Sequence, residues 1–261
     1  MIHNEKGTLN LLALMMIISA TTLAQSPFSK EIFVSQAGDS LLYRQLDPQT
    51  IDSQSKYPLI LFLHGAGERG NDNEAQLQHG ANMFTNPVNR DNYPSFALFP
   101  QCPTNSFWTS ITPNSTKNES FFPYVVSISP TLQAVKELVD KFIDNYPVDR
   151  NRIYIIGLSM GAMGTFDMVC RYPDLFAAAI PICGGVNTKR LEQLVTSTSF
   201  KIYHGDADQV VPVAFSRNAY TTLKAKNANV EYIEFPGINH DSWTPAFNTS
   251  HFMEWLFSQT K

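Results

Sequence analysis

The chain has 261 residues, of which 43% are hydrophobic and 16% are charged, and its formal net charge is −4 at pH 7. This composition predicts a single globular domain with a sizeable core, because α/β folds commonly reach about 250 residues as one unit. The slightly acidic balance argues against a nucleic-acid partner, which would normally require a basic patch.

The N-terminus is predicted to be a targeting segment. Residues 9–20 are almost wholly apolar, Lys6 precedes them, and Thr-Leu-Ala, a small-residue cleavage pattern, follows at 22–24. This order is typical of a secretory signal peptide, and the apolar run is short for a membrane-spanning helix. The alternative is an uncleaved membrane anchor.

We expect the signal peptide to comprise residues 1–24, with cleavage after Ala24 or, as the second choice, after Ala20. The mature chain is then one domain over 25–261 with no integral membrane segment. A protein with such a leader is exported, either to the periplasm or out of the cell.

The cysteines have to be compatible with an oxidising compartment, because the chain is expected to be exported. They are Cys102, Cys170 and Cys183, an odd number whose spacing matches neither a metal site nor a disulfide framework. We therefore expect free, mostly buried thiols, with a Cys102–Cys183 disulfide as the alternative.

The first half of the chain contains short strand candidates. Residues 31–34 and 41–44 are separated by Gly38 and an aspartate, a pattern that indicates a hairpin. The continuous apolar run at 58–63 suits a strand buried on both faces, as in a parallel sheet, and 96–99 is a shorter run of the same kind. Strands are therefore expected at all four places.

The second half alternates helices and strands. Ser129 and Pro130 begin a helix, because serine caps free amides and proline suits the first helical position. Further strands are expected over 152–156, 176–182, 200–203 and 230–235, and further helices from 160 to about 172 and over 188–195, 212–226 and 246–258. This alternation predicts an α/β architecture with a mostly parallel sheet.

Two long stretches, 64–95 and 101–128, show no such pattern. Both are rich in Asn, Ser, Thr and Pro, a composition typical of surface loops. No long insertion separates the helix after residue 160 from the strand that follows it, so no large lid domain is expected there.

A serine motif joins the strand at 152–156 to the helix after it. The sequence Gly-Leu-Ser-Met-Gly at 157–161 has the G-x-S-x-G pattern, which forms a sharp strand-to-helix turn and presents the Ser159 hydroxyl at the edge of a sheet. A Cβ atom at Gly157 or Gly161 would crowd this turn. Ser159 is therefore the candidate nucleophile.

A serine nucleophile needs a base, and in this arrangement the partners follow in the chain order serine, acid, histidine. His240 and His251 are the histidines that come after Ser159 and the plausible acids. His251 falls within the expected last helix, which has an apolar face, whereas His240 lies in a loop just past a strand. We expect His240 to be the base.

The base needs an acid that orients it. Asp206 and Asp208 lie in the loop after the strand at 200–203, whereas the other acids fall on expected helices or inside a strand. We favour Asp208 and keep Asp206 as the alternative, with Asp206 otherwise bracing the turn through backbone hydrogen bonds.

The glycine-rich segment 64–70 directly follows the buried strand at 58–63. Acyl transfer needs two N–H donors for the developing oxyanion. We expect one from Met160 and the other from Ala66, with Gly67 as the alternative. His64 is expected to be a structural hydrogen-bonding residue. No metal or cofactor is expected, because the chain has no H-E-x-x-H, Walker or dinucleotide-binding glycine motif.

Together these motifs resemble α/β-hydrolases of the secreted esterase type. The chain is similar to dienelactone-hydrolase-like and feruloyl/acetylxylan-esterase-like carboxylesterases and to small prolyl-oligopeptidase-family hydrolases. The motifs are H-G-A-G-E-R-G at 64–70, P-Q-C-P at 100–103 with a following tryptophan, G-L-S-M-G at 157–161, H-G-x-x-D-x-x-V-P at 204–212 and N-H-D-S-W at 239–243. The resemblance covers residues 32–258.

This resemblance implies an α/β-hydrolase fold, with a mostly parallel sheet of about eight strands flanked by helices. The implied strand order separates Cys102 from Cys183 by about three strands, or about 14 Å, which is too far for a disulfide unless the loops bring the two residues together. It also suggests that Trp108 and Trp243 line the acyl or alcohol pocket, the alternative being that both pack beneath loops.

The expected function is hydrolysis of carboxylic esters through an acyl-enzyme, with Ser159, Asp208 and His240 as the triad. The expected substrates are small-molecule or carbohydrate esters with short or aromatic acyl groups. The alternatives are a serine peptidase of the prolyl-oligopeptidase type and a non-catalytic binding protein on a hydrolase scaffold. The oligomeric state stays open.

Overall fold

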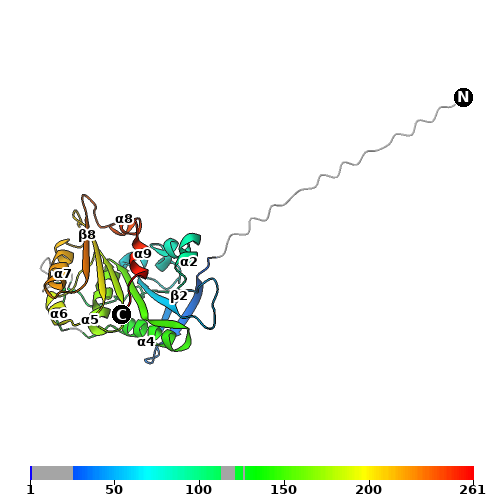
Figure 1. Cartoon of the computed structure of the whole chain (residues 1–261), viewed down its shortest axis with the longest axis horizontal. Coiled ribbons are helices and arrows are strands. Elements are labelled where there is room, and N and C mark those ends of the chain that lie inside the picture. The colour runs from blue at the N-terminus through cyan, green and yellow to red at the C-terminus, as the bar shows by residue number, and fades with distance from the viewer. Residues whose placement is uncertain (2–25, 113–120, 126) are drawn as a thin grey trace.

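One mixed sheet forms the centre of the protein. In the computed structural model, which describes Met1 and residues 26–112, 121–125 and 127–261, this sheet has eight strands in the order β1-β2-β4-β3-β5-β6-β7-β8 (Figure 1). The strands are β1 (Ser29–Val34), β2 (Ser40–Leu46), β3 (Tyr57–Leu63), β4 (Phe96–Pro100), β5 (Val148–Leu158), β6 (Ala178–Ile182), β7 (Ser199–Gly205) and β8 (Val230–Phe235). β2 pairs antiparallel with β1 and β4, and every pairing from β4 to β8 is parallel. The α/β-hydrolase fold is confirmed.

Helices cover both faces of this sheet. They are the 3-10 helices η1 (Ala66–Glu68) and η2 (Ala75–Leu77) and the α-helices α1 (Ala81–Thr85), α2 (Pro87–Asn92), α4 (Pro130–Asn145), α5 (Met160–Arg171), α6 (Thr188–Gln193), α7 (Ala214–Ala225), α8 (Trp243–Phe247) and α9 (Phe252–Phe257). Along β3, Leu59, Leu61 and Leu63 belong to the apolar core shared with α4 and α5. Ile60 and Phe62 point the other way, into the core shared with α1 and α9. This alternation explains the continuous apolar run of β3.

The helix predicted from Ser129 begins as expected. The Ser129 hydroxyl accepts a hydrogen bond from Leu132 N at 3.1 Å, and Pro130 occupies the first helical position of α4. α5 and β6 are joined by residues 172–177, so no lid domain is inserted between them. Within the described part of the chain, no helix is long and apolar enough to cross a membrane.

Two expectations about secondary structure were wrong. The stretch 64–95 is not one irregular loop, because it contains η1, η2, α1 and α2, and Phe84 of α1 is buried in the core. The single helix expected over 246–258 is divided into α8 and α9. His251, between them, has a φ of 67°, a left-handed conformation that cannot occur within a right-handed helix.

The three thiols are free, as expected. Cys102 follows β4 and Cys183 follows β6, with β3 and β5 between those strands, so the implied separation is also confirmed. Residues 2–24 of the signal peptide expected over 1–24 lie outside the described residues.

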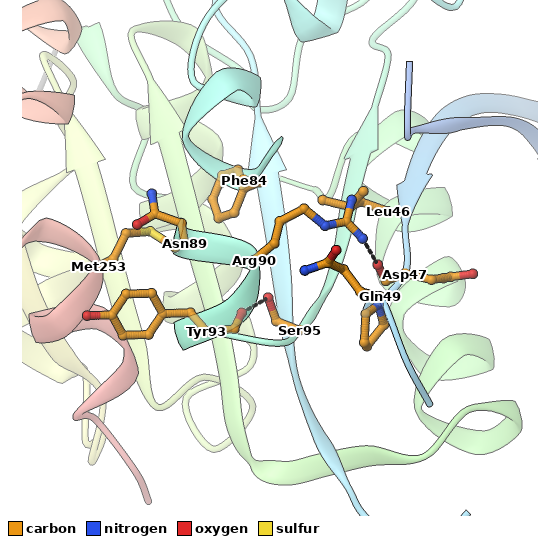
Figure 2. Close-up of a pocket in the computed structure, with 10 residues that line it drawn as sticks. Leu46, Asp47, Gln49, Phe84, Asn89, Arg90, Tyr93, Ser95 and Met253 are labelled. Carbon is orange, nitrogen blue, oxygen red and sulfur yellow. Dashed lines mark hydrogen bonds between the residues drawn. The ribbon is translucent and has the colours of Figure 1, made fainter. Parts of the chain in front are cut away.

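A small pocket opens between the end of β2, α2 and α9 (Figure 2). Its volume is about 10 Å³, and Arg90 closes one side by donating a hydrogen bond to Asp47 O at 2.9 Å. A space of that size holds roughly one water molecule. The pocket is therefore too small to bind a substrate.

Candidate active site

Ser159 occupies a strained turn at the centre of the sheet. It lies between the last residue of β5 and the first of α5, with φ 53° and ψ −116°. Its amide donates a hydrogen bond to Ile182 O of β6 at 2.8 Å, which ties the turn to the neighbouring strand. A positive φ is uncommon for a non-glycine residue and often marks a functional site. The turn directs the serine towards the carboxyl ends of the parallel strands.

The glycines beside Ser159 are required by packing. A Cβ atom at Gly157 would lie 2.2 Å from Gly161 O, and a Cβ atom at Gly161 would lie 1.9 Å from Leu63 O. Real Cβ atoms do not approach backbone oxygens so closely, and both oxygens belong to buried elements. The crowding predicted from the motif is confirmed.

Gly161→Ala is therefore expected to destabilise the protein by about 3 kcal/mol or more, lowering Tm by about 10 °C, because neither α5 nor β3 can move aside. Thermal unfolding followed by circular dichroism measures this change. The matched control is Gly67→Ala, since a Cβ atom at Gly67 has no heavy atom within 4 Å. Equal Tm values for the two variants would contradict the packing explanation.

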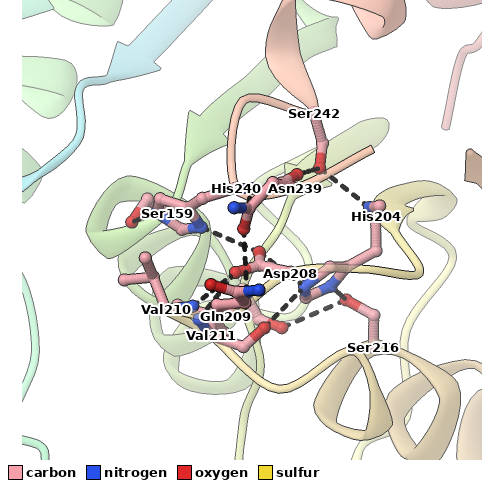
Figure 3. Close-up of polar contacts among 12 residues, drawn as sticks. Ser159, His204, Asp208, Gln209, Val210, Val211, Ser216, Asn239, His240 and Ser242 are labelled. Carbon is pink, nitrogen blue, oxygen red and sulfur yellow. Dashed lines mark hydrogen bonds and ion pairs between the residues drawn. The ribbon is translucent and has the colours of Figure 1, made fainter. Parts of the chain in front are cut away.

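His240 and Asp208 complete a hydrogen-bonded chain with Ser159 (Figure 3). His240 follows β8, and its Nε2 is 2.9 Å from Ser159 Oγ. Its Nδ1 is 2.8 Å from Asp208 Oδ2. The His240 side chain is 19% exposed, whereas that of Asp208 has no exposed surface. The structure thus brings together the three residues that were expected to act as nucleophile, base and orienting acid.

Asp208 is held as a carboxylate by the groups around it. Oδ1 accepts hydrogen bonds from the amides of Val210 and Val211 at 2.8 and 2.9 Å, and Oδ2 is within hydrogen-bond distance of His240 and His204. Burial alone would raise the pKa of Asp208, but the hydrogen bonds from His204, His240 and the two amides outweigh burial and hold this pKa well below its ordinary value. Asp208 is therefore ionised at neutral pH.

Asp206, the alternative acid, does not contact His240. Its Oδ1 accepts a hydrogen bond from Gly237 N at 2.6 Å, in the loop that carries His240. Asn239 joins the same two loops, because its Oδ1 accepts from Gln209 N at 2.9 Å. Asp206 therefore forms a hydrogen bond with the backbone, as expected, but with that of the loop after β8 and not with that of its own turn.

The two segments expected to form the oxyanion hole pack against each other. Met160 is the first residue of α5, where amide groups have no acceptor within the helix. Ala66 begins η1 and is exposed. Contact between Gly161 and the backbone of Leu63 and His64 places η1 beside the first turn of α5. This arrangement suits two converging N–H donors.

His64 and Trp108 form a buried support under that segment. His64 Nδ1 donates to Gly65 O at 2.6 Å, and Nε2 accepts from Cys102 N at 2.9 Å. Burial lowers the pKa of His64 to about 4, so the ring is neutral, which agrees with a structural role. Trp108 donates to His64 O at 2.9 Å and has no exposed surface. Trp108 therefore packs beneath the loops, which corrects the expectation that it lines the pocket.

Trp243 lies beside the candidate base. Its ring is 5.4 Å from the His240 ring in an edge-to-face arrangement and 5.2 Å from the ring of His79. Trp243 is partly exposed, so it can form an aromatic wall of the site. His251, the alternative base, is exposed, and its Nδ1 contacts Glu254 on the surface.

Sequence reasoning missed two polar residues behind Asp208. His204 and Ser216 are fully buried, and His204 Nδ1 is 2.7 Å from Ser216 Oγ (Figure 3). His204 is the first residue of the H-G-x-x-D motif, so a signal for it was present in the sequence. Ser216 lies in α7, and no sequence pattern connects it with the site.

One group of residues has the composition of a metal site. Cys183, Asp208 and His240 each offer a ligand atom, and these atoms lie within 4.8 Å of one another. Burial raises the pKa of the Cys183 thiol well above its ordinary value, so this thiol is a poor ligand. The Asp208 oxygens and His240 Nδ1 are engaged in hydrogen bonds. This donor set favours a hydrogen-bonded chain over a metal centre.

Such a chain can activate a serine hydroxyl. His240 Nε2 can take the proton of Ser159 Oγ, and Asp208 stabilises the imidazolium that forms. Two amide donors at the N-terminus of α5 and in η1 can stabilise an oxyanion. The arrangement is therefore suited to acyl transfer.

Comparison with known proteins gives one family match. The family model described as phospholipase/carboxylesterase matches residues 50–254. A solved thermostable esterase is 36% identical with a TM-score of 0.80, and the alignment covers 90% of this chain and 64% of that one.

Two curated relatives match over short segments. Poly(3-hydroxyalkanoate) depolymerase C of Paucimonas lemoignei is 46% identical over 52 residues, 20% of this chain and 13% of its own length. Acetylxylan esterase A of Emericella nidulans is 43% identical over 51 residues, 20% of this chain and 17% of its own. The chain therefore spans only a small part of these relatives, and just under two thirds of the thermostable esterase.

Proposed function

The chain belongs to the phospholipase/carboxylesterase family of α/β-hydrolases, and on that basis we propose that it is a serine esterase that cleaves carboxylic esters. The observation that carries the proposal is the hydrogen-bonded chain from Ser159 Oγ through His240 to Asp208, with contacts of 2.9 and 2.8 Å. A serine, a histidine and an aspartate in this geometry catalyse acyl transfer, in which the serine becomes acylated.

In the proposed reaction, Ser159 Oγ attacks the ester carbonyl carbon while His240 Nε2 takes the hydroxyl proton. The amide of Met160 and that of Ala66 or Gly67 stabilise the oxyanion. His240 then protonates the leaving alcohol, and a water molecule activated by His240 hydrolyses the acyl-enzyme. Asp208 keeps the Nδ1–H of His240 directed towards itself throughout.

The proposed substrates are esters with short or aromatic acyl groups, including acyl groups on carbohydrate. Three observations support this choice: the Trp243 wall beside His240, the direct connection of α5 to β6 without a lid, and the local similarity to acetylxylan esterase A. We also propose that residues 1–24 direct export, which mass spectrometry of the mature N-terminus would test.

On p-nitrophenyl esters, kcat/KM is expected to be highest for acetate to butyrate and to fall by octanoate. Each additional CH₂ contributes about 0.8 kcal/mol only where an apolar surface receives it, and without a lid domain between α5 and β6 we expect little such surface for long chains. Initial rates across a panel of chain lengths, with methyl ferulate as the aromatic acyl ester, measure this preference.

Peptide p-nitroanilides serve as the comparison in the same assay and should be cleaved negligibly. A panel in which decanoate or palmitate is the best substrate would overturn the proposed acyl preference. Anilide cleavage comparable with acetate cleavage would instead favour a peptidase.

A further inference from the structure

A second histidine contacts the carboxylate that holds His240 (Figure 3). The side chain of His204, in β7, has no exposed surface, and its Nε2 is 3.1 Å from Asp208 Oδ2 and 3.0 Å from Val211 O. Its Nδ1 is 2.7 Å from Ser216 Oγ. Because His240 Nδ1 is 2.8 Å from the same carboxylate oxygen, Asp208 Oδ2 lies between two imidazole rings.

The atoms around His204 determine which of its nitrogens carries a proton. Both groups that face Nε2 are acceptors, a carboxylate and a backbone carbonyl, so Nε2 carries a proton whether the ring is neutral or charged. At Nδ1, the Ser216 hydroxyl can accept from a protonated nitrogen while it donates to Gly184 O at 3.1 Å, or it can donate to an unprotonated nitrogen in place of Gly184 O. His204 is therefore a hydrogen-bond donor to Asp208 in either state.

The carboxylate has no remaining freedom to turn. Oδ1 accepts from the amides of Val210 and Val211 at 2.8 and 2.9 Å, and Oδ2 accepts from both histidines. A carboxylate has about four acceptor positions, and all four are used here. Loss of the His204 bond would free one side of Oδ2 and allow the carboxylate to tilt away from His240.

Other titratable groups also face this cluster. Cys183 lies beside Asp208, and burial raises the pKa of its thiol, so it stays neutral. Glu234 of β8 is the register partner of His204, and its carboxylate is paired with Arg217 at 2.6 Å. The negative charges of Asp208 and Asp241 add to the effect of burial in raising the pKa of the Cys183 thiol.

We propose that His204 is a positioning residue of this site, whose Nε2–H shares the Asp208 carboxylate with His240 and holds it in the orientation that His240 needs. The inference rests on the proposed function, because the reaction it serves is proton transfer at Ser159.

The protonation of the ring is tested without turnover. Nitrogen-15 NMR of the histidine rings in the full-length wild-type protein, with His204→Gln used for assignment, should show His204 Nε2 protonated between about pH 5 and 8. An unprotonated Nε2 in this range would overturn the proposal. Because the measurement needs no substrate, it tests whether His204 donates to Asp208 even if the protein cleaves none of the esters in the panel.

Two variants test the functional role. His204→Phe removes the donor but keeps a ring, whereas His204→Gln places an amide N–H within reach of Asp208. For His204→Phe, we expect kcat on p-nitrophenyl acetate to fall about 10- to 100-fold with KM nearly unchanged, by analogy with other supporting hydrogen bonds. His204→Gln should recover most of this loss, because its amide N–H can take the place of the Nε2–H of His204.

Ser216→Ala is the control, because it removes the hydroxyl at Nδ1 and leaves the Nε2 contact with Asp208 in place. Ser216→Ala should therefore lower kcat on p-nitrophenyl acetate less than His204→Phe does. A folded His204→Phe protein with wild-type kcat would refute the role of His204. Equal impairment of the Phe and Gln variants would show that His204 acts by packing. If His204→Phe does not fold, His204→Gln and the NMR measurement decide. An inactive wild-type protein would contradict the proposed function instead.

Discussion

Ser159→Ala is expected to lower kcat for p-nitrophenyl acetate by about 10⁶-fold, as replacement of the nucleophile does in a serine protease. The reason is that the alanine methyl group has no proton for His240 to take and no oxygen to attack the ester. A fluorophosphonate probe, which labels activated serines covalently, should label the wild-type protein and leave the variant unlabelled.

The control for this experiment is Ser258→Ala. Ser258 is exposed, and its hydroxyl donates to Trp255 O, away from the site. This variant should retain wild-type turnover and labelling. The role proposed for Ser159 would have to be abandoned if purified Ser159→Ala turned over the ester at an undiminished rate.

Asp208→Asn is expected to lower kcat by about 10⁴-fold while the fold remains intact, as the corresponding change does in a serine protease. An asparagine can present its N–H₂ group to His240 Nδ1, so that the ring proton moves to Nε2. Nε2 is the atom 2.9 Å from Ser159 Oγ, and once protonated it cannot accept the serine proton. Steady-state kinetics and circular dichroism together measure the effect.

Asp206→Asn is the matched comparison. The new side chain keeps an oxygen that can accept the hydrogen bond from Gly237 N, so turnover should stay near the wild-type value while Tm falls slightly. If Asp206→Asn lost more turnover than Asp208→Asn, with both proteins folded, the two roles would be exchanged.

Local signals in the sequence predicted most of the fold. The hairpin at Gly38, which has a φ of 89°, and the capped start of α4 at Ser129 both depend on neighbouring residues, and both were predicted. The short helices α1 and α2 were missed, because five or six residues are too few for a 3.6-residue periodicity to be visible. The break at His251 was missed for a related reason, since nothing in the adjacent sequence demands a left-handed residue there.

The sequence by itself determined the serine turn, because the glycines at 157 and 161 are needed by contacts within that turn and with the strand beside it. Chain order and loop placement also favoured His240 and Asp208 over His251 and Asp206, and His240 and Asp208 are the residues that the structure brings together with Ser159. The serine turn and the loops that carry Asp208 and His240 each consist of a short continuous segment, so their signals can be read from neighbouring residues.

Only the tertiary structure decided which side chains support the site and which are exposed. Trp108 is buried beneath His64, whereas Trp243 lies beside His240, although each tryptophan lies in or after a recognisable motif. His204 meets Ser216 and the shared oxygen of Asp208 because β7, α7 and the loop after β7 converge there. Burial and hydrogen-bond partners depend on how distant segments pack, and a single sequence carries no direct record of those long-range contacts.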